Sequence, residues 1–342
     1  MKIFIEKEIF ENIIVFNEDT PNWYKILCNH AEIFINMTDD ALKAEELPGT
    51  AIFEYIQATG ARPIKALRYQ FDNIYDDAKH LLDFPRSVYF LNVKSEIAEQ
   101  WQAEFGMIVQ NSTTIDDNVL NASHFDDFSA GQVCSDSKGT GWKNIINFKL
   151  PPLNSIIIND QYLFTHENGK RGTLNILEFI KSVLPDQLKT DFHILLYAKE
   201  PDNTGIDWCI AKTGEIKTAL NNLRKPYQIV LEIVYGETIH KRFALSNYFV
   251  ITMDKGFCLF KSSDTSIVHD DNDFVYESVF SRIGESSGKT QFVVAHKKLL
   301  DLKNIAEGKA EFISNLKNVK NQRIQGDCNK NKSLNNRLIN DV

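Results

Sequence analysis

The sequence lacks the marks of a membrane or secreted protein. No stretch reaches 18 consecutive apolar residues, which is about the shortest run that spans a bilayer as a helix. The N-terminal segment MKIFIEKEIFENIIVF carries charges through its apolar run, and no small-residue cleavage site of a secretory signal follows it. We therefore expect a soluble, cytoplasmic protein that does not associate with membranes.

Cysteine is scarce, and its placement excludes two kinds of stabilised domain. The five cysteines are odd in number, and no two of them stand in C-x-x-C spacing. This usage is typical of a reducing cytosol and argues against a disulfide framework or a thiolate zinc site. The histidines show no metal-ligand spacing, and no Ser-His-Asp or Cys-His arrangement can be assigned. We expect no metal ion and no cofactor.

The composition is that of a folded protein large enough for two domains. Of the 342 residues, 43% are hydrophobic and 25% are charged, near the average for globular proteins. The net charge of −8 disfavours a body coated in nucleic acid, but the charge is uneven. Within residues 317–342, the basic side chains outnumber the acidic ones by four, and seven residues are asparagine. We interpret this segment as a basic, disordered tail that can touch nucleic acid through Lys317, Lys320, Arg323, Lys330, Lys332 and Arg337.

Residues 1–110 have the pattern of alternating strands and helices. Ser87–Leu91 reads as a buried strand, a helix follows from Ser95 to Phe105, and Gly106 ends it before a strand at Met107–Val109. So short a strand–helix–strand unit implies a parallel, right-handed crossover. The earlier elements are expected at Trp23–His30 (helix), Glu32–Asn36 (strand), Asp39–Leu47 (helix) and Thr50–Thr59 (helix). We predict an N-terminal α/β domain over 1–110.

Residues 111–152 are rich in Asn, Ser, Thr, Asp and Gly, and we interpret them as a loop-rich linker with one strand at Trp142–Leu150. From 153 to 316 the pattern is β-α-β-α-β-β-β with a closing helix over 291–316. Strands alternating with helices predict a mixed sheet covered by helices, so the fold class is α/β with two domains. The elements expected before the closing helix are Ile156–Phe164, Leu174–Leu184, Phe192–Ala198, Gly214–Leu223, Gln228–Tyr235, Phe243–Thr252 and Gly256–Phe260.

The most chemically suggestive feature is His240-x-Arg242-x4-Asn247. Side chains alternate between the faces of a strand, so His240 and Arg242 are expected to point the same way. A guanidinium can grip two phosphate oxygens, and an imidazole can act as nucleophile or proton carrier. Asn247 comes on the next stretch and can orient a side chain. The pattern therefore favours a phosphate site.

This spacing resembles the H-x-K-x4-D motif of the phospholipase D superfamily, which lies on a strand at the end of a β-α-β-α-β run. The resemblance covers roughly residues 153–260, about one half-unit of the family, and it places His240 at the nucleophile, Arg242 at the phosphate-binding lysine and Asn247 at the aspartate. Because the motif lacks the carboxylate and occurs once, the chain is more similar to the non-catalytic members of the superfamily. The resemblance implies a phospholipase-D-like domain over 153–316 that binds phosphate through Lys241, Arg242 and Asn247, with His240 catalytic only in an active dimer.

Simpler readings of these and other residues stay open. His240 and Arg242 can serve a structural role by pairing with a carboxylate such as Glu232, Glu237 or Asp160. The segment Gly284–Thr290 has three residues between its glycines rather than the four of a phosphate-binding loop, so a turn is the better interpretation. A PIN-like metal nuclease needs aspartates at strand ends, where this sequence has asparagine. The acids considered for that site, and otherwise interpreted as helix caps or solvated residues, are Asp39, Asp40, Asp72, Asp76, Asp77, Asp116 and Asp117.

Three functions follow from the sequence as hypotheses. The first is an accessory or effector subunit whose degenerate phosphodiesterase-like domain binds a phosphate-bearing ligand, including nucleic acid, or a protein partner, in the manner of a bacterial antiviral defence protein. The second is an active phosphodiesterase or nuclease assembled as a homodimer, because active members of the superfamily bring two motifs together. The third is a structural subunit of a larger complex.

Overall fold

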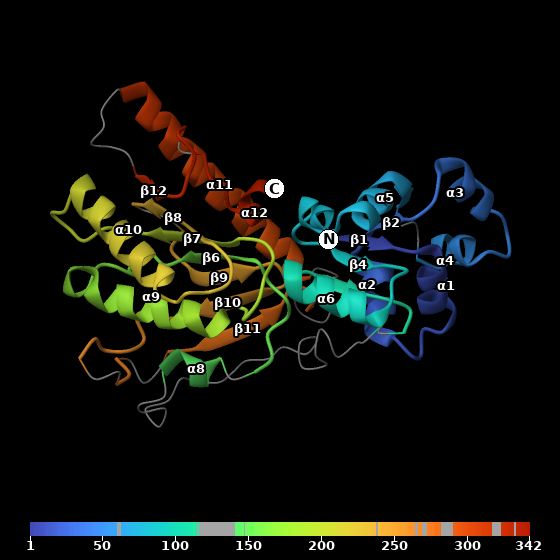
Figure 1. Cartoon of the computed structure of the whole chain (residues 1–342), viewed down its shortest axis with the longest axis horizontal. Helices are drawn as coiled ribbons and strands as arrows, with labels where there is room; N and C mark the ends of the chain where they lie inside the picture. Colours follow the sequence, from blue (N-terminus) through green and yellow to red (C-terminus); the bar gives the residue numbers. More distant parts are fainter. Residues whose placement is uncertain are drawn as a thin grey trace. The chain divides into compact units, whose positions relative to one another are not determined.

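The computed structural model divides the chain into two compact units (Figure 1). The first comprises Met1–Asp127 and Ser278–Val293, and the second comprises Phe128–Glu277 and Val294–Val342. Each unit carries a β-sheet covered by helices, so the predicted α/β class is confirmed. The structure describes residues 1–59, 63–113, 115, 141–146, 148–236, 239–263, 266–268, 272–281, 290–316, 323–331 and 333–342.

A parallel sheet forms the centre of the first unit. Among the described residues it has the strand order β3-β2-β1-β4-β5, and every pair of neighbours runs parallel. Both faces are buried: the Phe4 ring lies 5.0 Å from the Phe34 and Tyr89 rings on one face, and Phe90 meets Trp23 at 4.9 Å on the other. Two covered faces are typical of parallel sheets. The strands are β1 (Lys2–Ile5), β2 (Glu32–Ile35), β3 (Ile64–Ala66), β4 (Val88–Phe90) and β5 (Ile108–Gln110).

The helices of the first unit follow the strands in alternation. The predicted strand–helix–strand unit is confirmed, because β4 and β5 pair in parallel and the helix between them ends at Gly106 in the left-handed region, with φ of 61°. Glycine adopts that conformation without the steric cost of a Cβ atom. The helices are α1 (Lys7–Val15), α2 (Pro21–His30), α3 (Asp39–Glu45), α4 (Ala51–Thr59), α5 (Arg68–Asp76), the 3-10 helix η1 (Ala78–Asp83) and α6 (Ser95–Phe105).

The second unit holds a mixed sheet in the order β11-β10-β9-β6-β7-β8-β12 within the described residues. Strands β6, β7 and β8 run parallel, whereas β9 is antiparallel to both β6 and β10, and β12 is antiparallel to β8. The strands are β6 (Ser155–Asn159), β7 (Phe192–Ala198), β8 (Ile229–Tyr235), β9 (Arg242–Ser246), β10 (Phe249–Met253), β11 (Phe274–Ser278) and β12 (Ile324–Gly326).

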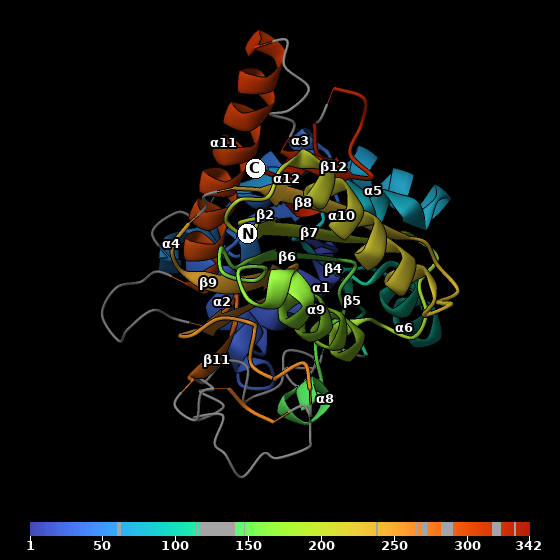
Figure 2. The ribbon, with the colours of Figure 1, turned by 90° about the vertical axis from the view of Figure 1, so that its left-hand side faces the viewer.

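Helices cover both faces of the mixed sheet (Figures 1 and 2). One face packs against α9 and α10 through a cluster that includes Ile156 and Leu196. On the other face, Tyr197 donates a hydrogen bond from its hydroxyl to the Leu302 carbonyl of α11 at 2.8 Å. The closing helix predicted at 291–316 is confirmed as α11. The helices are α8 (Gly141–Ile145), the 3-10 helix η4 (Glu167–Gly169), α9 (Lys170–Val183), α10 (Ile206–Asn221), α11 (Gln291–Leu316) and α12 (Arg337–Asn340).

Several sequence predictions about this unit are wrong. The strand expected at Phe243–Thr252 is two strands, β9 and β10, which pair antiparallel around a turn. The strand expected at Trp142–Leu150 is instead the short helix α8, whose Trp142 packs on Phe179 and Phe257 at 5.1 and 5.9 Å. The turn falls at Ser246-Asn247, a polar pair that the apolar residues on either side obscured, and an aromatic residue fits a helix as readily as a strand when it meets a core.

The C-terminal segment is ordered over its described residues, so the prediction of a disordered tail across 317–342 is wrong for them. β12 extends the sheet beside β8, and Asn336 caps α12 by accepting a hydrogen bond from the Leu338 N–H at 3.0 Å. The prediction rested on the polar composition of the segment, which is typical of disorder. It missed that distant strands supply the hydrogen-bond partners of these residues. Residues 317–322 and 332 lie outside the described part of the chain.

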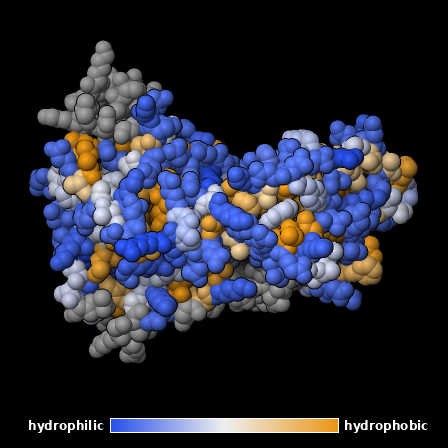
Figure 3. All heavy atoms as spheres, viewed as in Figure 1, coloured by the Kyte–Doolittle hydropathy of each residue, from blue (hydrophilic) through white to orange (hydrophobic). Residues whose placement is uncertain are grey.

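The residues on the face drawn in Figure 3 are mostly hydrophilic in each unit, with apolar residues in small groups. Within the described residues, none of the helices combines the length and the apolar character needed to cross a bilayer.

Candidate functional site at the carboxyl end of β6

The segment that contains His240 lies at the carboxyl end of β6, where the order of the mixed sheet reverses. After β6 the chain adds β7 and β8 on one side, and it then returns to place β9 on the other side. In α/β sheets, ligands bind in the crevice outside the strand ends at such a switch point. Asn159 and Asp160 end β6 there, and both are buried.

Asp160 organises the backbone of this edge. Its Oδ2 accepts a hydrogen bond from the Phe257 N–H at 2.8 Å, and its Oδ1 accepts one from the Tyr162 N–H at 3.0 Å. Burial raises the pKa of Asp160 to about 6, while these two N–H groups and the charge of Arg242 oppose the rise. Gly256 makes the close approach feasible, because a Cβ atom there would lie 2.5 Å from Asp160 Oδ2. The Asp160 carboxylate therefore holds two loops together and has little capacity left for a ligand.

Asn159 fixes the segment that leads into β9. Its Nδ2 donates hydrogen bonds to the carbonyls of Ile239 at 2.8 Å and Lys241 at 2.6 Å. These two bonds bracket His240, so the backbone around this residue is held against the strand end. The Asn159 side chain thus holds the backbone of three consecutive basic residues (240–242) at the switch point.

His240 and Arg242 both approach the ring of Tyr162. The Arg242 guanidinium carbon lies 4.9 Å from the centroid of that ring, and the His240 ring meets it edge-on at 6.3 Å and 85°. Arg242 also donates from Nη1 to the Asp254 carbonyl at 2.9 Å. Its buried Nε has no hydrogen-bond partner in the described part of the chain. The expectation that His240 and Arg242 lie on one side is consistent with this shared neighbour, and Arg242 is coupled by charge to Asp160, one of the carboxylates named from the sequence.

The two ends of this basic segment differ in exposure. His240 and Lys241 are exposed and Arg242 is partly buried. Within the described residues no hydrogen bond to the His240 ring is formed, so none of the described carboxylates orients its imidazole as a base; Glu237 lies outside these residues. The arrangement can bind an anion, but it lacks the oriented nucleophile that covalent phosphoryl chemistry requires.

The prediction that Asn247 contacts phosphate is wrong. Asn247 has no exposed surface, its Oδ1 accepts from the N–H groups of Asn154 at 3.1 Å and Ser155 at 3.2 Å, and its Nδ2 donates to Asn154 Oδ1 at 3.1 Å. It also lies past the far end of β9 from Arg242, roughly 17 Å away at about 3.4 Å per residue. Asn247 therefore supports the β9–β10 turn and takes no part in the His240 cluster.

The described basic residues of the C-terminal segment have different surroundings, and two of them are engaged by other parts of the second unit. Arg323 forms an ion pair with Glu200. Arg337 donates to the Asp191 carbonyl at 2.6 Å and to Thr190 Oγ1 at 2.7 Å, so it ties α12 to the start of β7. Lys330 is exposed. Lys317, Lys320 and Lys332 lie outside the described residues.

The structure also reveals an acid that the sequence reasoning missed. Glu6 directly follows β1, the central strand of the parallel sheet, and accepts hydrogen bonds from Asn36 Nδ2 at 3.0 Å and from the Tyr75 hydroxyl. Burial raises the pKa of Glu6. It was missed because the first strand was expected at Glu32–Asn36, although the apolar run Ile3–Ile5 was a usable signal. In the described residues, no group of three or more His, Cys, Asp or Glu side chains is placed to hold a metal ion.

Several other residues named from the sequence lie beyond the described part of the chain, namely Gly284–Lys289, Asp116, Asp117 and Glu237.

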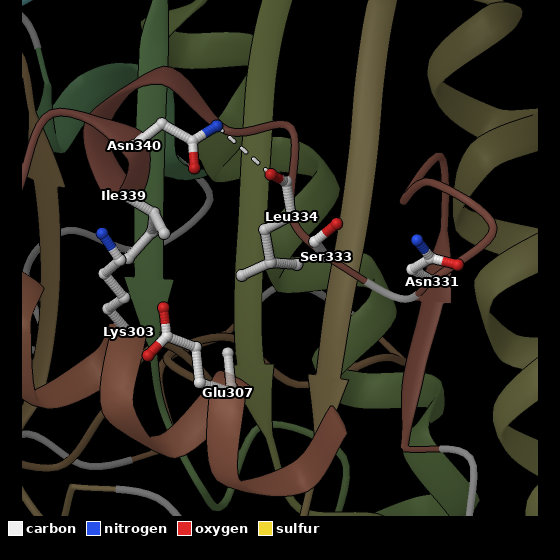
Figure 4. A pocket seen from close by; sticks show the side chains of 8 residues that line it. Lys303, Glu307, Asn331, Ser333, Leu334, Ile339 and Asn340 are labelled. Carbon is white, nitrogen blue, oxygen red and sulfur yellow. Dashed lines mark hydrogen bonds between the residues drawn. The ribbon is translucent and has the colours of Figure 1, made fainter. Parts of the chain in front are cut away.

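A small pocket in the second unit lies apart from the His240 cluster (Figure 4). Its volume is about 120 Å³, and residues of α11 and the C-terminal segment line it. Lys303 and Glu307 stand on the helix side, facing Leu334 and Ile339. Ligand pockets are usually several hundred Å³, so this cavity is a packing space beside the docked C-terminus rather than a cofactor site.

Comparison with known proteins does not assign this chain. No known family model matches it, and no curated protein matches it significantly.

Proposed function

We propose that the chain is a binding subunit that recognises a phosphate-bearing ligand, including nucleic acid, through His240, Lys241 and Arg242, without cleaving it. The observation that carries this proposal is the convergence of His240 and Arg242 on the Tyr162 ring, next to the exposed Lys241, at the switch point of the mixed sheet. An arginine and a lysine in one exposed segment suit phosphate oxygens. An accessory role in a bacterial defence complex remains part of this proposal.

Binding without cleavage follows from the surroundings of the cluster. Catalysis of the kind suggested by the sequence resemblance needs a carboxylate near the histidine, and Asn247 is committed to the β9–β10 turn. Asp160, the nearby carboxylate, already accepts two backbone hydrogen bonds. The His240 imidazole therefore acts as a hydrogen-bond donor to phosphate rather than as a nucleophile.

Binding of a fluorescent abasic oligonucleotide, a chain of sugar and phosphate without bases, tests this proposal. Lys241→Ala should weaken binding severalfold and reduce the slope of log K against log salt by about one, because one phosphate contact is lost. Lys143→Ala, which removes an exposed lysine on α8, is the matched control and should leave the slope unchanged. Equal affinity in Lys241→Ala and wild type would assign the cluster a structural role.

The absence of cleavage is checked separately with bis(p-nitrophenyl) phosphate and with labelled nucleic acid. We expect no turnover of either substrate by wild type. The binding proposal does not require a dimer, so size-exclusion chromatography can show either a monomer or a dimer. Hydrolysis that disappears in His240→Ala, in a protein that is dimeric in solution, would establish the alternative of an active phosphodiesterase.

A further inference from the structure

Tyr162 presents an exposed aromatic ring at the centre of the His240 cluster. Its exposed fraction is 40%, and its hydroxyl has no hydrogen-bond partner in the described part of the chain. Its backbone is nevertheless fixed, because its N–H donates to Asp160 Oδ1 and its carbonyl accepts from the Thr165 N–H at 3.2 Å and from Thr165 Oγ1 at 2.9 Å. The turn therefore fixes the backbone that carries the ring.

A guanidinium and an imidazole lie against this ring. Arg242 lies over it at 4.9 Å, and His240 meets its edge. The exposed Lys241 directly precedes Arg242 in the chain. An exposed aromatic ring beside a guanidinium offers a surface for stacking next to a cation, which a plain phosphate site does not need.

We infer that the ligand of this site is single-stranded nucleic acid and that one of its bases stacks on Tyr162 while the flanking phosphates contact Lys241 and Arg242. This inference rests on the proposed function, because it adds a base contact to the phosphate contacts. Single-strand binders combine a cationic path for the backbone with aromatic rings on which bases stack, and every base offers a π-face. Arginine over the ring adds a cation–π contribution.

A duplex fits this site less well. Its bases are already stacked on one another, so Tyr162 would gain no partner without unpairing a base, which costs free energy. The net charge of −8 also disfavours the long electrostatic contact that a duplex needs. A short unpaired stretch requires only the local cations around the ring.

The test compares an abasic oligonucleotide with a base-containing oligonucleotide of the same length, as DNA and as RNA, by fluorescence anisotropy. Wild type should bind the base-containing strand roughly tenfold more tightly than the abasic strand. Tyr162→Phe should keep that ratio because the hydroxyl is not used, and Tyr162→Leu should reduce it to about one. Tyr69→Leu, at a tyrosine of α5 that is 62% exposed, is the matched control and should keep the wild-type ratio.

The outcomes separate the two proposals. If wild type binds abasic and base-containing strands equally, the stacking inference fails while the phosphate site stands. If it binds neither, both fail. A duplex that binds as tightly as the single strand would also overturn the inference. The melting temperature of each variant shows that it is folded, and quenching of a 2-aminopurine base in the strand by wild type and Tyr162→Phe, but not by Tyr162→Leu, reports stacking independently of affinity.

Discussion

Glu232 lies in the middle of β8 with no exposed surface, and both of its oxygens are engaged by the C-terminal segment. Oε1 accepts a hydrogen bond from the Asn335 N–H at 2.7 Å, and Oε2 accepts one from the Asn336 N–H at 2.9 Å. Burial raises the pKa of Glu232 to about 7, Asp327 adds to the rise, and the two N–H groups oppose it. One carboxylate thus couples the docking of the C-terminus to protonation.

The sign of the resulting pH dependence follows from linkage. Since the pKa of Glu232 is about 7 in the folded protein and 4.5 ordinarily, the folded state binds this proton more tightly. The stability that protonation contributes is fully present below pH 4.5 and is lost as the pH rises through 7, by up to about 3 kcal/mol. Guanidinium unfolding between pH 4.5 and 7.5 should show this loss in wild type relative to Glu232→Gln.

A second buried group, His193, also makes stability depend on pH, so the effect of Glu232 has to be measured as the difference between wild type and Glu232→Gln. Burial lowers the pKa of His193 to about 3, with the charge of Arg337 adding to the effect. Its contribution to stability is therefore present above pH 6.5 and lost as the pH falls toward 3, which is opposite in sign to that of Glu232. Glu99→Gln, at an exposed position of α6, should retain the wild-type pH profile. A Glu232→Gln profile parallel to that of wild type would contradict the linkage.

At the scale of elements, the packing of α9 positions the turn that carries Tyr162. Gly172, in the first turn of α9, lies against the backbone of Leu163, and a Cβ atom there would stand 1.7 Å from the Leu163 carbonyl oxygen. No side chain can be accommodated without moving the helix or the turn. The glycine therefore sets how closely α9 approaches the loop between Asp160 and Thr165.

Gly172→Ala should destabilise the protein by about 3 kcal/mol or more, because backbone atoms must shift to relieve the overlap. Gly214→Ala is the control in α10, where a Cβ atom would meet nothing within 4 Å, and it should raise the free energy of unfolding by about 0.5–1 kcal/mol. Thermal and guanidinium unfolding measure both changes. Equal stability of the two variants would show that the turn at Leu163 is free to move.

At the scale of the whole molecule, the chain leaves the first unit and later returns to it. Ser278–Val293 belongs to the first unit, although the sequence had placed this stretch in a C-terminal domain of 153–316. Its Phe280 packs edge-on against the buried Trp23 at 5.9 Å, and its Phe292 ring lies 4.6 Å from the guanidinium carbon of Arg86. A cut after the first unit's N-terminal stretch would therefore leave its core incomplete.

A fragment of residues 1–127 should accordingly melt at a lower temperature than a fusion in which a Gly/Ser linker joins 1–127 to 278–293. The physical reason is the exposure of apolar surface around Trp23, at about 25 cal/mol for each Å² uncovered. Circular dichroism of the two purified fragments measures the difference. Identical melting temperatures would mean that the returning segment contributes no stability to this unit.

Local signals in the sequence determined the α/β class and most of the long elements. The helix Ser95–Phe105 was predictable because its apolar spacing and Gly106 lie within its own stretch, although Ser95 is its first residue and forms no side-chain cap. β7 and β8 were predictable because strands buried on both faces are continuous apolar runs. Alternation led to the expectation that His240 and Arg242 share a side; His240 lies before β9, and both side chains approach the Tyr162 ring.

Only the tertiary structure decided which residues act together. The turn at Asn247 was hidden because the groups that satisfy its amide, on Asn154 and Ser155, are more than ninety positions away in the sequence. The order of residues 323–331 and 333–342 depends on Glu232 and Thr190 in the same way. Tyr162 gained its neighbours only when β9 paired with β6. Propensity depends on adjacent residues, whereas burial and hydrogen bonding depend on partners that only the folded chain brings near.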